Sequence, residues 1–286
     1  MVSRTHFNIF RRGSTTYFTS TLFFPPAVRE DVFVLYSFVR TADDYVDAVP
    51  QEADAFWAFC DTYRQVLAGV PSGDVVIDRF VDLMHRIDIR PEWVDAFLHS
   101  MARDLSQNTY ETIADLEDYL YGSSEVIGLM MARIMGLPED AWDAARALGK
   151  SMQFINFIRD IDEDLLMGRT YFPQEDLAAF GLSTLDPVET RARPEAFSRF
   201  VAFQIERYLT WQKQADAGFH YIPPRLRIPV RTASDMYRWT ADAIRRDPFV
   251  VYERKVKPSA GRIVAQACAT TLGMHLPPAV FVGDSE

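Results

Sequence analysis

Two aspartate-rich segments contain the residues of this sequence best suited to chemistry. The first includes Asp43, Asp44 and Asp47. Asp43 and Asp47 are four residues apart, so on a helix their carboxylates lie one turn apart on the same face and repel each other unless a cation lies between them. Mg²⁺ prefers oxygen ligands and usually combines one or two carboxylates with water and phosphate oxygens. The spacing therefore indicates either a magnesium site or an acidic face exposed to solvent.

The second segment favours the magnesium site. Gln153, Asn156, Asp160 and Asp164 follow one another at intervals of three, four and four, which forms one polar stripe along a predicted helix. The residues between them are mostly large and apolar, so this helix is expected to be buried. Buried carboxylates are unfavourable unless they are paired or bind a metal. We expect the two acidic segments to face each other across a cavity and to hold a diphosphate through shared Mg²⁺.

Several segments resemble the phytoene and squalene synthase family. Residues 153–173 resemble its second signature, with Gln153, Asn156, Arg159, Asp160, Glu163, Asp164, Gly168, Arg169, Tyr171 and Pro173 in register. Residues 40–47 resemble the first aspartate-rich signature, and residues 13–25 resemble an N-terminal element that contacts diphosphate through small hydroxyl residues. Residues 119–128 resemble the family's central helix of tyrosine and small residues. A later stretch with Tyr237, Arg254 and Lys255 matches the C-terminal part more loosely, so the resemblance covers about residues 13–260.

The resemblance implies an enzyme that joins two prenyl diphosphates head to head through a cyclopropylcarbinyl diphosphate. It implies that Mg²⁺, or Mn²⁺ in its place, is bound by Asp43, Asp44, Asp47, Asn156, Asp160 and Asp164. It implies substrate binding by Ser14, Thr16, Arg40, Gln153, Arg159, Arg169 and Tyr171. The planar guanidinium groups suit diphosphate oxygens. Tyr119 and Tyr237 are candidates for lining the cavity near a carbocation, and ordinary core packing is the alternative for both.

Chain length of the substrate depends on the depth of the cavity. Thr21 lies seven residues after Ser14, two turns further along the same face if this segment is helical. A small residue there leaves room for a long tail, which favours geranylgeranyl diphosphate as substrate and phytoene, a carotenoid precursor, as product. Squalene or dehydrosqualene synthesis from farnesyl diphosphate is the alternative. The sequence has no Gly-x-Gly-x-x-Gly motif, and no NADPH is expected for the phytoene reaction.

Other classes of protein fit the sequence less well. A head-to-tail prenyl synthase or a terpene cyclase would also use two metal-binding motifs, but the second signature argues against both. A non-catalytic family member acting in assembly should have lost its acidic residues, which are present here. Departures from the family pattern are Ser123, Ser124 and Glu125, and Thr16 where Ser is commoner.

The elements that must position these residues are predicted to be helices. Gly and Pro are few, and apolar residues recur at helical spacing. We expect a single all-α domain over residues 1–286, an isoprenoid-synthase-type helical bundle around a central cavity. Helices are predicted at 27–46, 51–70, 76–88, 91–103, 112–134, 139–166, 193–216 and 228–246.

Composition narrows the possible partners and compartment. The net charge is −10, which disfavours nucleic acid. Two cysteines give no disulfide framework, and neither the N-terminus nor the apolar run 126–137 predicts a signal peptide or a membrane span. We expect a cytoplasmic monomer that contacts membrane surfaces transiently to release an apolar product.

Overall fold

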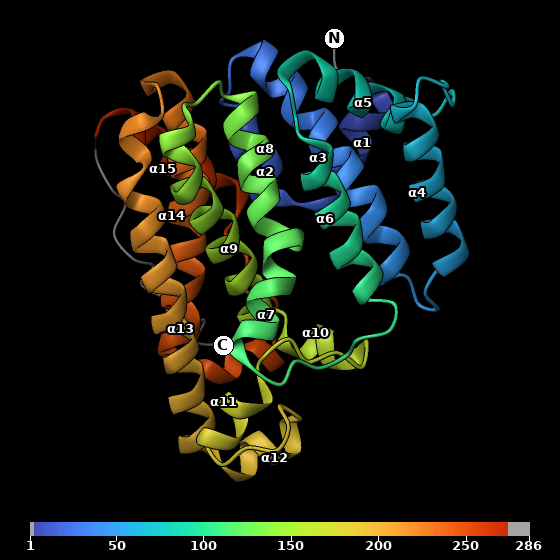
Figure 1. Ribbon diagram of the computed structural model, residues 1–286. Coiled ribbons are helices and arrows are strands. Elements are labelled where there is room, and N and C mark those ends of the chain that lie inside the picture. The colour runs from blue at the N-terminus through green and yellow to red at the C-terminus, as the bar shows by residue number, and fades with distance from the viewer. Residues whose placement is uncertain (1–2, 274–286) are drawn as a thin grey trace.

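Long helices packed side by side make up most of the computed structural model, which describes residues 3–273 (Figure 1). The longer helices are α3 (Pro26–Asp47), α4 (Ala53–Leu67), α5 (Val75–Ile87), α6 (Pro91–Arg103), α9 (Trp142–Arg159), α13 (Pro194–Ala217) and α14 (Pro224–Arg246). The shorter helices are α1 (Arg4–Gly13), α2 (Thr15–Thr21), α7 (Ile113–Leu120), α8 (Val126–Ile134), α10 (Ile161–Leu166), α11 (Gln174–Ala179), α12 (Pro187–Ala192) and α15 (Ala260–Thr271). Within residues 3–273 the only β-type pairing is an isolated bridge between Tyr110 and Pro173. The predicted all-α class is therefore confirmed.

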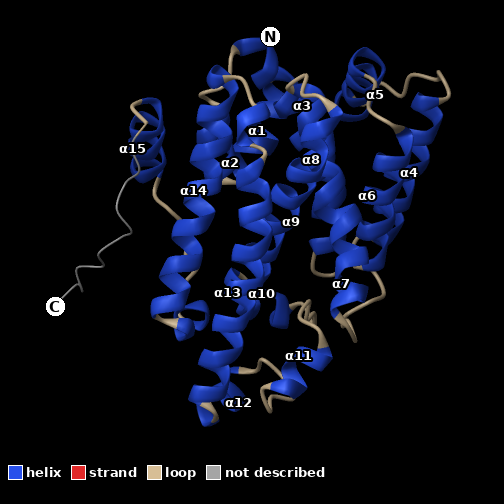
Figure 2. Ribbon diagram, turned by 60° about the vertical axis from the view of Figure 1, so that its left-hand side comes forward, coloured by secondary structure: helices blue, strands red, loops and turns tan. Residues whose placement is uncertain are grey.

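The helices form two packed groups with α8 and α9 between them. Helices α3 to α6 lie on one side, and α13, α14 and α15 lie on the other, as both views show (Figures 1 and 2). The short helices α10, α11 and α12 lie together at one end of the bundle (Figure 2). Because α3 and α9 both run toward this end, the two acidic segments are brought to the same region of the molecule.

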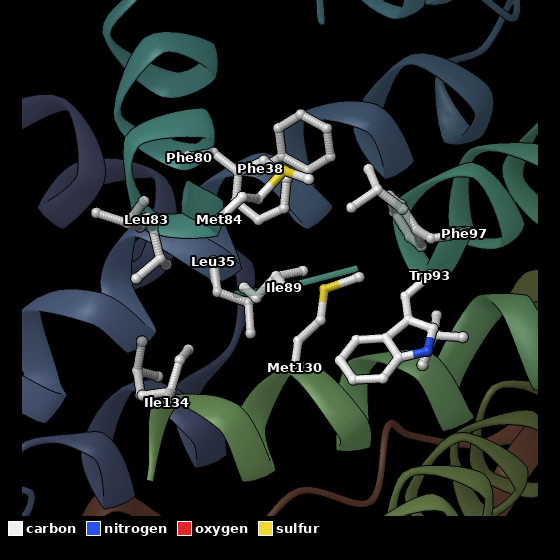
Figure 3. Close-up of a cluster of buried hydrophobic side chains, with 14 of the residues drawn as sticks. Leu35, Phe38, Phe80, Leu83, Met84, Ile89, Trp93, Phe97, Met130 and Ile134 are labelled. Atoms are coloured by element: carbon white, nitrogen blue, oxygen red, sulfur yellow. The ribbon is translucent and has the colours of Figure 1, made fainter. Parts of the chain in front are cut away.

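Two apolar cores hold these groups. In the first, side chains of α3, α5, α6 and α8 interdigitate (Figure 3), and the Phe38 and Phe80 rings stack with their centroids 3.9 Å apart. In the second, apolar side chains of α9 contact α13, where the Phe154 and Trp211 rings meet edge to face at 5.0 Å. The apolar residues that separate the polar stripe of α9 are buried as predicted: Phe154, Ile155, Phe157, Ile158 and Ile161.

Helix boundaries differ from the prediction in several places. Helices α1 and α2 precede residue 27 and were not predicted, although Ser3 and Ser14 cap them through side-chain hydrogen bonds. Residues 121–125 form a π-helical turn between α7 and α8. Helices α11, α12 and α15 also lie outside the predicted ranges.

The predicted helix 139–166 is interrupted at Asp160. This residue has φ −101° and ψ 17° and separates α9 from α10. Its carboxylate binds the adjacent guanidinium of Arg159 at 2.8 Å and 2.5 Å. Neighbouring side chains on a regular helix do not face each other, so this pairing accompanies the break.

None of the helices in residues 3–273 combines the length and the apolar composition needed to cross a lipid bilayer.

Candidate active site

The first acidic segment occupies the last turns of α3. Arg40 pairs with Asp43 at 2.9 Å and with Asp44 at 2.5 Å, so it reaches this cluster as the spacing predicted. Burial, and then the charge of Asp47, raise the pKa of Asp43 to about 8. The positive charge of Arg40 is therefore too small to offset the burial of the Asp43 carboxylate and its repulsion by Asp47.

The second acidic segment spans the junction of α9 and α10. Burial favours the neutral form of Asp160, but the hydrogen bond and charge of Arg159, together with Lys255 at 3.2 Å, outweigh it and lower the pKa. Asp164 has no such balance: burial, and then the charges of Asp160 and Asp47, raise its pKa well above the usual value. Asp164 and Asp47 lie more than one hundred residues apart in sequence yet repel each other in the fold, so the two segments do face each other.

Arg169 links the two segments directly. Its side chain is only 4% exposed, and one guanidinium nitrogen donates to Asp47 Oδ1 at 2.6 Å. The other donates to the carbonyl oxygen of Val46 at 2.6 Å and to that of Asp104 at 3.3 Å. Gln51 donates to the same two carbonyls, at 2.9 Å and 2.7 Å. In this structure Arg169 joins the ends of α3 and α6 to the segment after α10, and its expected binding of diphosphate stays a prediction.

Asp104, which the sequence analysis did not single out, is a further buried carboxylate in this region. It is 3% exposed and ends α6. Tyr119 donates its hydroxyl to Asp104 Oδ2 at 2.7 Å, and Tyr171 donates to Oδ1 at 3.2 Å. Burial raises the pKa of Asp104 to about 6 despite these hydrogen bonds and the nearby charge of Arg169. No motif marks this residue, because its partners come from distant segments.

An apolar cavity of about 260 Å³ lies within the bundle. Val39 of α3 and Gln153 of α9 line it, and they precede Asp43 and Asp160 by four and seven residues. Along α9 its wall runs from Ala144 to Gln153. These nine residue steps correspond to about 14 Å at a rise of about 1.5 Å per residue. Thr21 is 4% exposed and lines this cavity, as does Tyr17 on the same helix. The position of Thr21 in the cavity wall agrees with the spacing argument, and its effect on chain length stays a prediction.

The two tyrosines expected near a carbocation lie behind this wall. Tyr119 turns its hydroxyl to Asp104, so it is part of the polar network at the end of α6. Tyr237 packs against Tyr17, with ring centroids 5.5 Å apart, and Tyr17 forms part of the wall. Tyr17 therefore lies between the cavity and Tyr237. No prediction was made for Tyr17 from the sequence.

Three predicted substrate-binding residues have local roles in this conformation. Ser14 caps α2 and accepts a hydrogen bond from the Tyr17 amide at 3.2 Å, and Thr16 follows it in the first turn. Gln153 accepts a hydrogen bond from the Asn156 side chain at 3.3 Å. Ser14 and Thr16 occupy the start of the helix that carries Tyr17 and Thr21 to the cavity.

The departures from the family pattern form the π-helical turn. Ser123 and Ser124 line the cavity. Glu125 points away from it and is paired with Arg146 at 2.8 Å and with Lys150 at 3.1 Å. Gly149 permits the close approach of α9, because a Cβ there would lie 2.3 Å from the Ser124 carbonyl oxygen.

The acidic region has the ligand chemistry that Mg²⁺ requires. Among residues 3–273 no three acidic, histidine or cysteine side chains are gathered closely enough to enclose an ion, since arginine and lysine pair with several of the carboxylates. Asp43 and Asp164 nevertheless have raised pKa values, which indicates unmet demand for positive charge. The buried carboxamide oxygen of Asn156 has no hydrogen-bond partner among the described residues. Hard oxygen donors in need of a cation fit Mg²⁺.

An all-helical bundle that holds an apolar cavity and brings two acidic segments together is the architecture of an isoprenoid synthase. The family model for squalene/phytoene synthase matches residues 10–262. The chain belongs to the squalene/phytoene synthase family.

Individual relatives agree with this assignment. The chain is 31% identical over 263 residues to a 15-cis-phytoene synthase of Synechococcus elongatus, covering 85% of this chain and 84% of that protein. A crystal structure of a squalene synthase from Alicyclobacillus acidocaldarius matches with a TM-score of 0.75 and 26% identity over 85% of this chain and 94% of the other. A dehydrosqualene synthase structure matches with a TM-score of 0.83 at 22% identity over 94% of each chain, which supports the fold.

Proposed function

We propose that this protein condenses two molecules of geranylgeranyl diphosphate head to head to give phytoene. The observation that carries the proposal is a cavity extending about 14 Å along α9, with Gln153 at the end nearer the acidic segments. Diphosphates would lie at the acidic end and prenyl tails in the apolar part. The phytoene synthase among the relatives supports the choice of substrate.

The acidic segments would hold the metal and the diphosphates. Mg²⁺, or Mn²⁺, would be held by Asp43, Asp44, Asp47, Asn156, Asp160 and Asp164, and when bound it supplies positive charge that stabilises a departing diphosphate. Arg40 and Arg159 would bind diphosphate oxygens, since each already contacts a carboxylate of the site. Arg169 would hold the two segments at a fixed separation.

The reaction requires charge stabilisation and exclusion of water. The C1–O bond of one substrate breaks to give an allylic cation and diphosphate, and the double bond of the second substrate attacks that cation. Loss of a proton gives the cyclopropylcarbinyl diphosphate. A second C–O cleavage, rearrangement and proton loss give phytoene without a reductant, so no NADPH is required. The apolar wall would exclude water from the cations, and the Tyr17 ring, backed by Tyr237, would stabilise positive charge.

Farnesyl diphosphate is the second candidate substrate. The fold matches of this chain include a squalene synthase and a dehydrosqualene synthase. The size of residue 21 is the feature on which the choice rests, since Thr21 is smaller than an aromatic side chain that would shorten the cavity.

Diphosphate release with geranylgeranyl diphosphate tests the role of the acidic segments. We expect activity to require Mg²⁺ or Mn²⁺ and to fall at least ~100-fold in Asp47→Asn and in Asp164→Asn. Asp176→Asn is the matched control, because Asp176 is a buried aspartate paired with Gln204 and Arg207 on α13. Full activity of both site variants, or activity in excess EDTA, would contradict the proposed metal site.

We also propose that the enzyme contacts membranes transiently to release its apolar product. Flotation with liposomes during turnover should recover part of the protein and most of the product in the lipid fraction. Product that stays with lipid-free protein would count against this proposal.

A further inference from the structure

Asp104 is placed to control the tyrosines beside the acidic segments. Each carboxylate oxygen accepts one tyrosine hydroxyl: Oδ2 from Tyr119 and Oδ1 from Tyr171. The two tyrosines come from α7 and from the segment after α10, and their rings are 5.4 Å apart. One carboxylate therefore fixes the relative position of two aromatic side chains that belong to different parts of the chain.

The backbone of Asp104 also contacts Arg169, the residue that links the two acidic segments. Its carbonyl oxygen accepts from Arg169 and from Gln51, and both of these also donate to the Val46 carbonyl. Val46 immediately precedes Asp47. Asp104 is thus connected to Asp47 through Arg169 and to the second segment through Tyr171, which stacks on Phe157 of α9 with centroids 4.1 Å apart.

Burying this carboxylate is unfavourable, which argues for a specific role. It lies close enough to Asp47 for the two charges to repel, and it has no direct ion pair of its own at salt-bridge distance among the described residues. A buried carboxylate whose direct side-chain partners are two hydroxyls, with the Arg169 charge only nearby, costs stability relative to a neutral side chain of similar shape. An amide would fit the same space but would offer one acceptor oxygen in place of two.

We propose that Asp104 is a positioning residue for the prenyl transfer reaction, holding Tyr119 and Tyr171 so that Arg169 and Asp47 are correctly oriented toward the diphosphate site. The proposal rests on the proposed function for its kinetic consequences. It differs from a structural role in requiring that Asp104 act through the two tyrosines. The Tyr119 ring lies 5.4 Å from that of Tyr171, whose hydroxyl accepts from Arg169 at 3.5 Å, so loss of Asp104 or of the Tyr119 hydroxyl should have largely the same effect.

A double-mutant cycle tests this directly. We expect Asp104→Asn to lower kcat with geranylgeranyl diphosphate about 10- to 100-fold while changing KM much less, because misplacement at a reacting centre reduces rate more than binding. Tyr119→Phe should have a similar effect. The double variant should be no more than ~3-fold slower than the slower single variant. If the kcat losses of the two single variants multiply in the double variant, the proposal is wrong.

Asp176→Asn is again the matched control, because Asp176 has two side-chain partners and comparable burial. It should lower the Tm to a similar extent without lowering kcat. Equal kcat for Asp104→Asn and Asp176→Asn would show that Asp104 is only structural.

A binding readout separates this inference from the proposed function. In the wild-type protein and in Asp176→Asn, Mg²⁺ with inorganic diphosphate should raise the Tm, and in Asp104→Asn that increase should be reduced by at least half. An unreduced shift in Asp104→Asn overturns the inference whether or not the protein makes phytoene. A wild-type protein that shows the shift but makes no hydrocarbon would refute the proposed reaction alone.

Discussion

Replacing Arg169 by Lys tests whether the two acidic segments depend on the guanidinium that joins them. Lys keeps the positive charge for Asp47 but cannot also reproduce the fork that reaches the carbonyls of Val46 and Asp104. Gln51 still donates to both carbonyls, so neither is left unpaired. The loss is therefore about two hydrogen bonds, or ~1–3 kcal/mol. For a chain of this size that corresponds to roughly 2–6 °C in Tm.

Replacing Arg169 by Ala removes the charge as well. Asp47 and Asp164 would then face each other without this cation. Breaking a fully buried pair by removing one partner costs about 3–5 kcal/mol, and because the Asp47 side chain is 33% exposed we expect the cost to lie at or below the lower end of this range. We expect Arg169→Ala to be less stable than Arg169→Lys. Because the guanidinium also fixes the position of Asp47, both variants should lose at least ~10-fold in kcat.

Calorimetry and steady-state kinetics on the same preparations are the assays. Arg207→Lys is the matched control, since Arg207 forms a two-nitrogen pair with the buried Asp176 away from the acidic segments. It should lose comparable Tm and keep its kcat. The reasoning is refuted if Arg169→Lys has wild-type Tm and kcat, or if Arg207→Lys loses activity to the same extent.

Three further predictions concern the cavity, the acidic segment and the π-helical turn. Thr21→Phe should shift preference from geranylgeranyl toward farnesyl diphosphate in a competition assay, by up to ~1,000-fold if all five carbons of the last isoprene unit lose their burial at about 0.8 kcal/mol each; an unchanged ratio would show that Thr21 does not limit the cavity. Because the folded-state pKa of Asp43 is raised to about 8, its stabilising contribution is complete below about pH 4 and is lost as the pH rises through about 8. The Tm of metal-free protein should therefore fall over this pH range, and added Mg²⁺ should raise the Tm more at pH 8 than at pH 6. If the Tm of Asp43→Asn falls with pH as steeply as that of the wild type, the reasoning is wrong. Glu125→Gln should lower the free energy of unfolding by about 1–3 kcal/mol in urea, because Arg146 and Lys150 lose their shared carboxylate, whereas wild-type stability would mean that this ion pair is dispensable.

The all-helical class was predictable from sequence because it depends on local periodicity. The meeting of the acidic segments was predicted from their chemistry, since buried carboxylates are unfavourable unless they are paired or share a cation. The apolar residues around Asn156 and Asp160 indicated a buried helix, and the fold buries them. The spacing of Arg40 to Asp43 and Asp44 predicted their ion pairs, since residues three and four apart on a helix are neighbours.

Features that depend on tertiary contacts were not predictable. Asp104 ends a helix without any signature, and only the fold brings Tyr119 and Tyr171 to it. Arg169 matched a diphosphate-binding position by motif, and this role stays a prediction, but the motif gave no sign of its contacts with the carbonyls at the ends of α3 and α6. The break at Asp160 accompanies pairing with the adjacent Arg159 and with Lys255, which lies 95 residues further along the chain.

Product analysis tests the central claim most directly. Purified protein would be incubated with Mg²⁺ and either geranylgeranyl or farnesyl diphosphate, without NADPH, and the extracted hydrocarbons identified by mass spectrometry. We predict phytoene from the C20 substrate, formed in preference to any C30 product. A C30 hydrocarbon or presqualene diphosphate from the C15 substrate alone would contradict the proposed substrate, and no product from either substrate would contradict the proposed reaction.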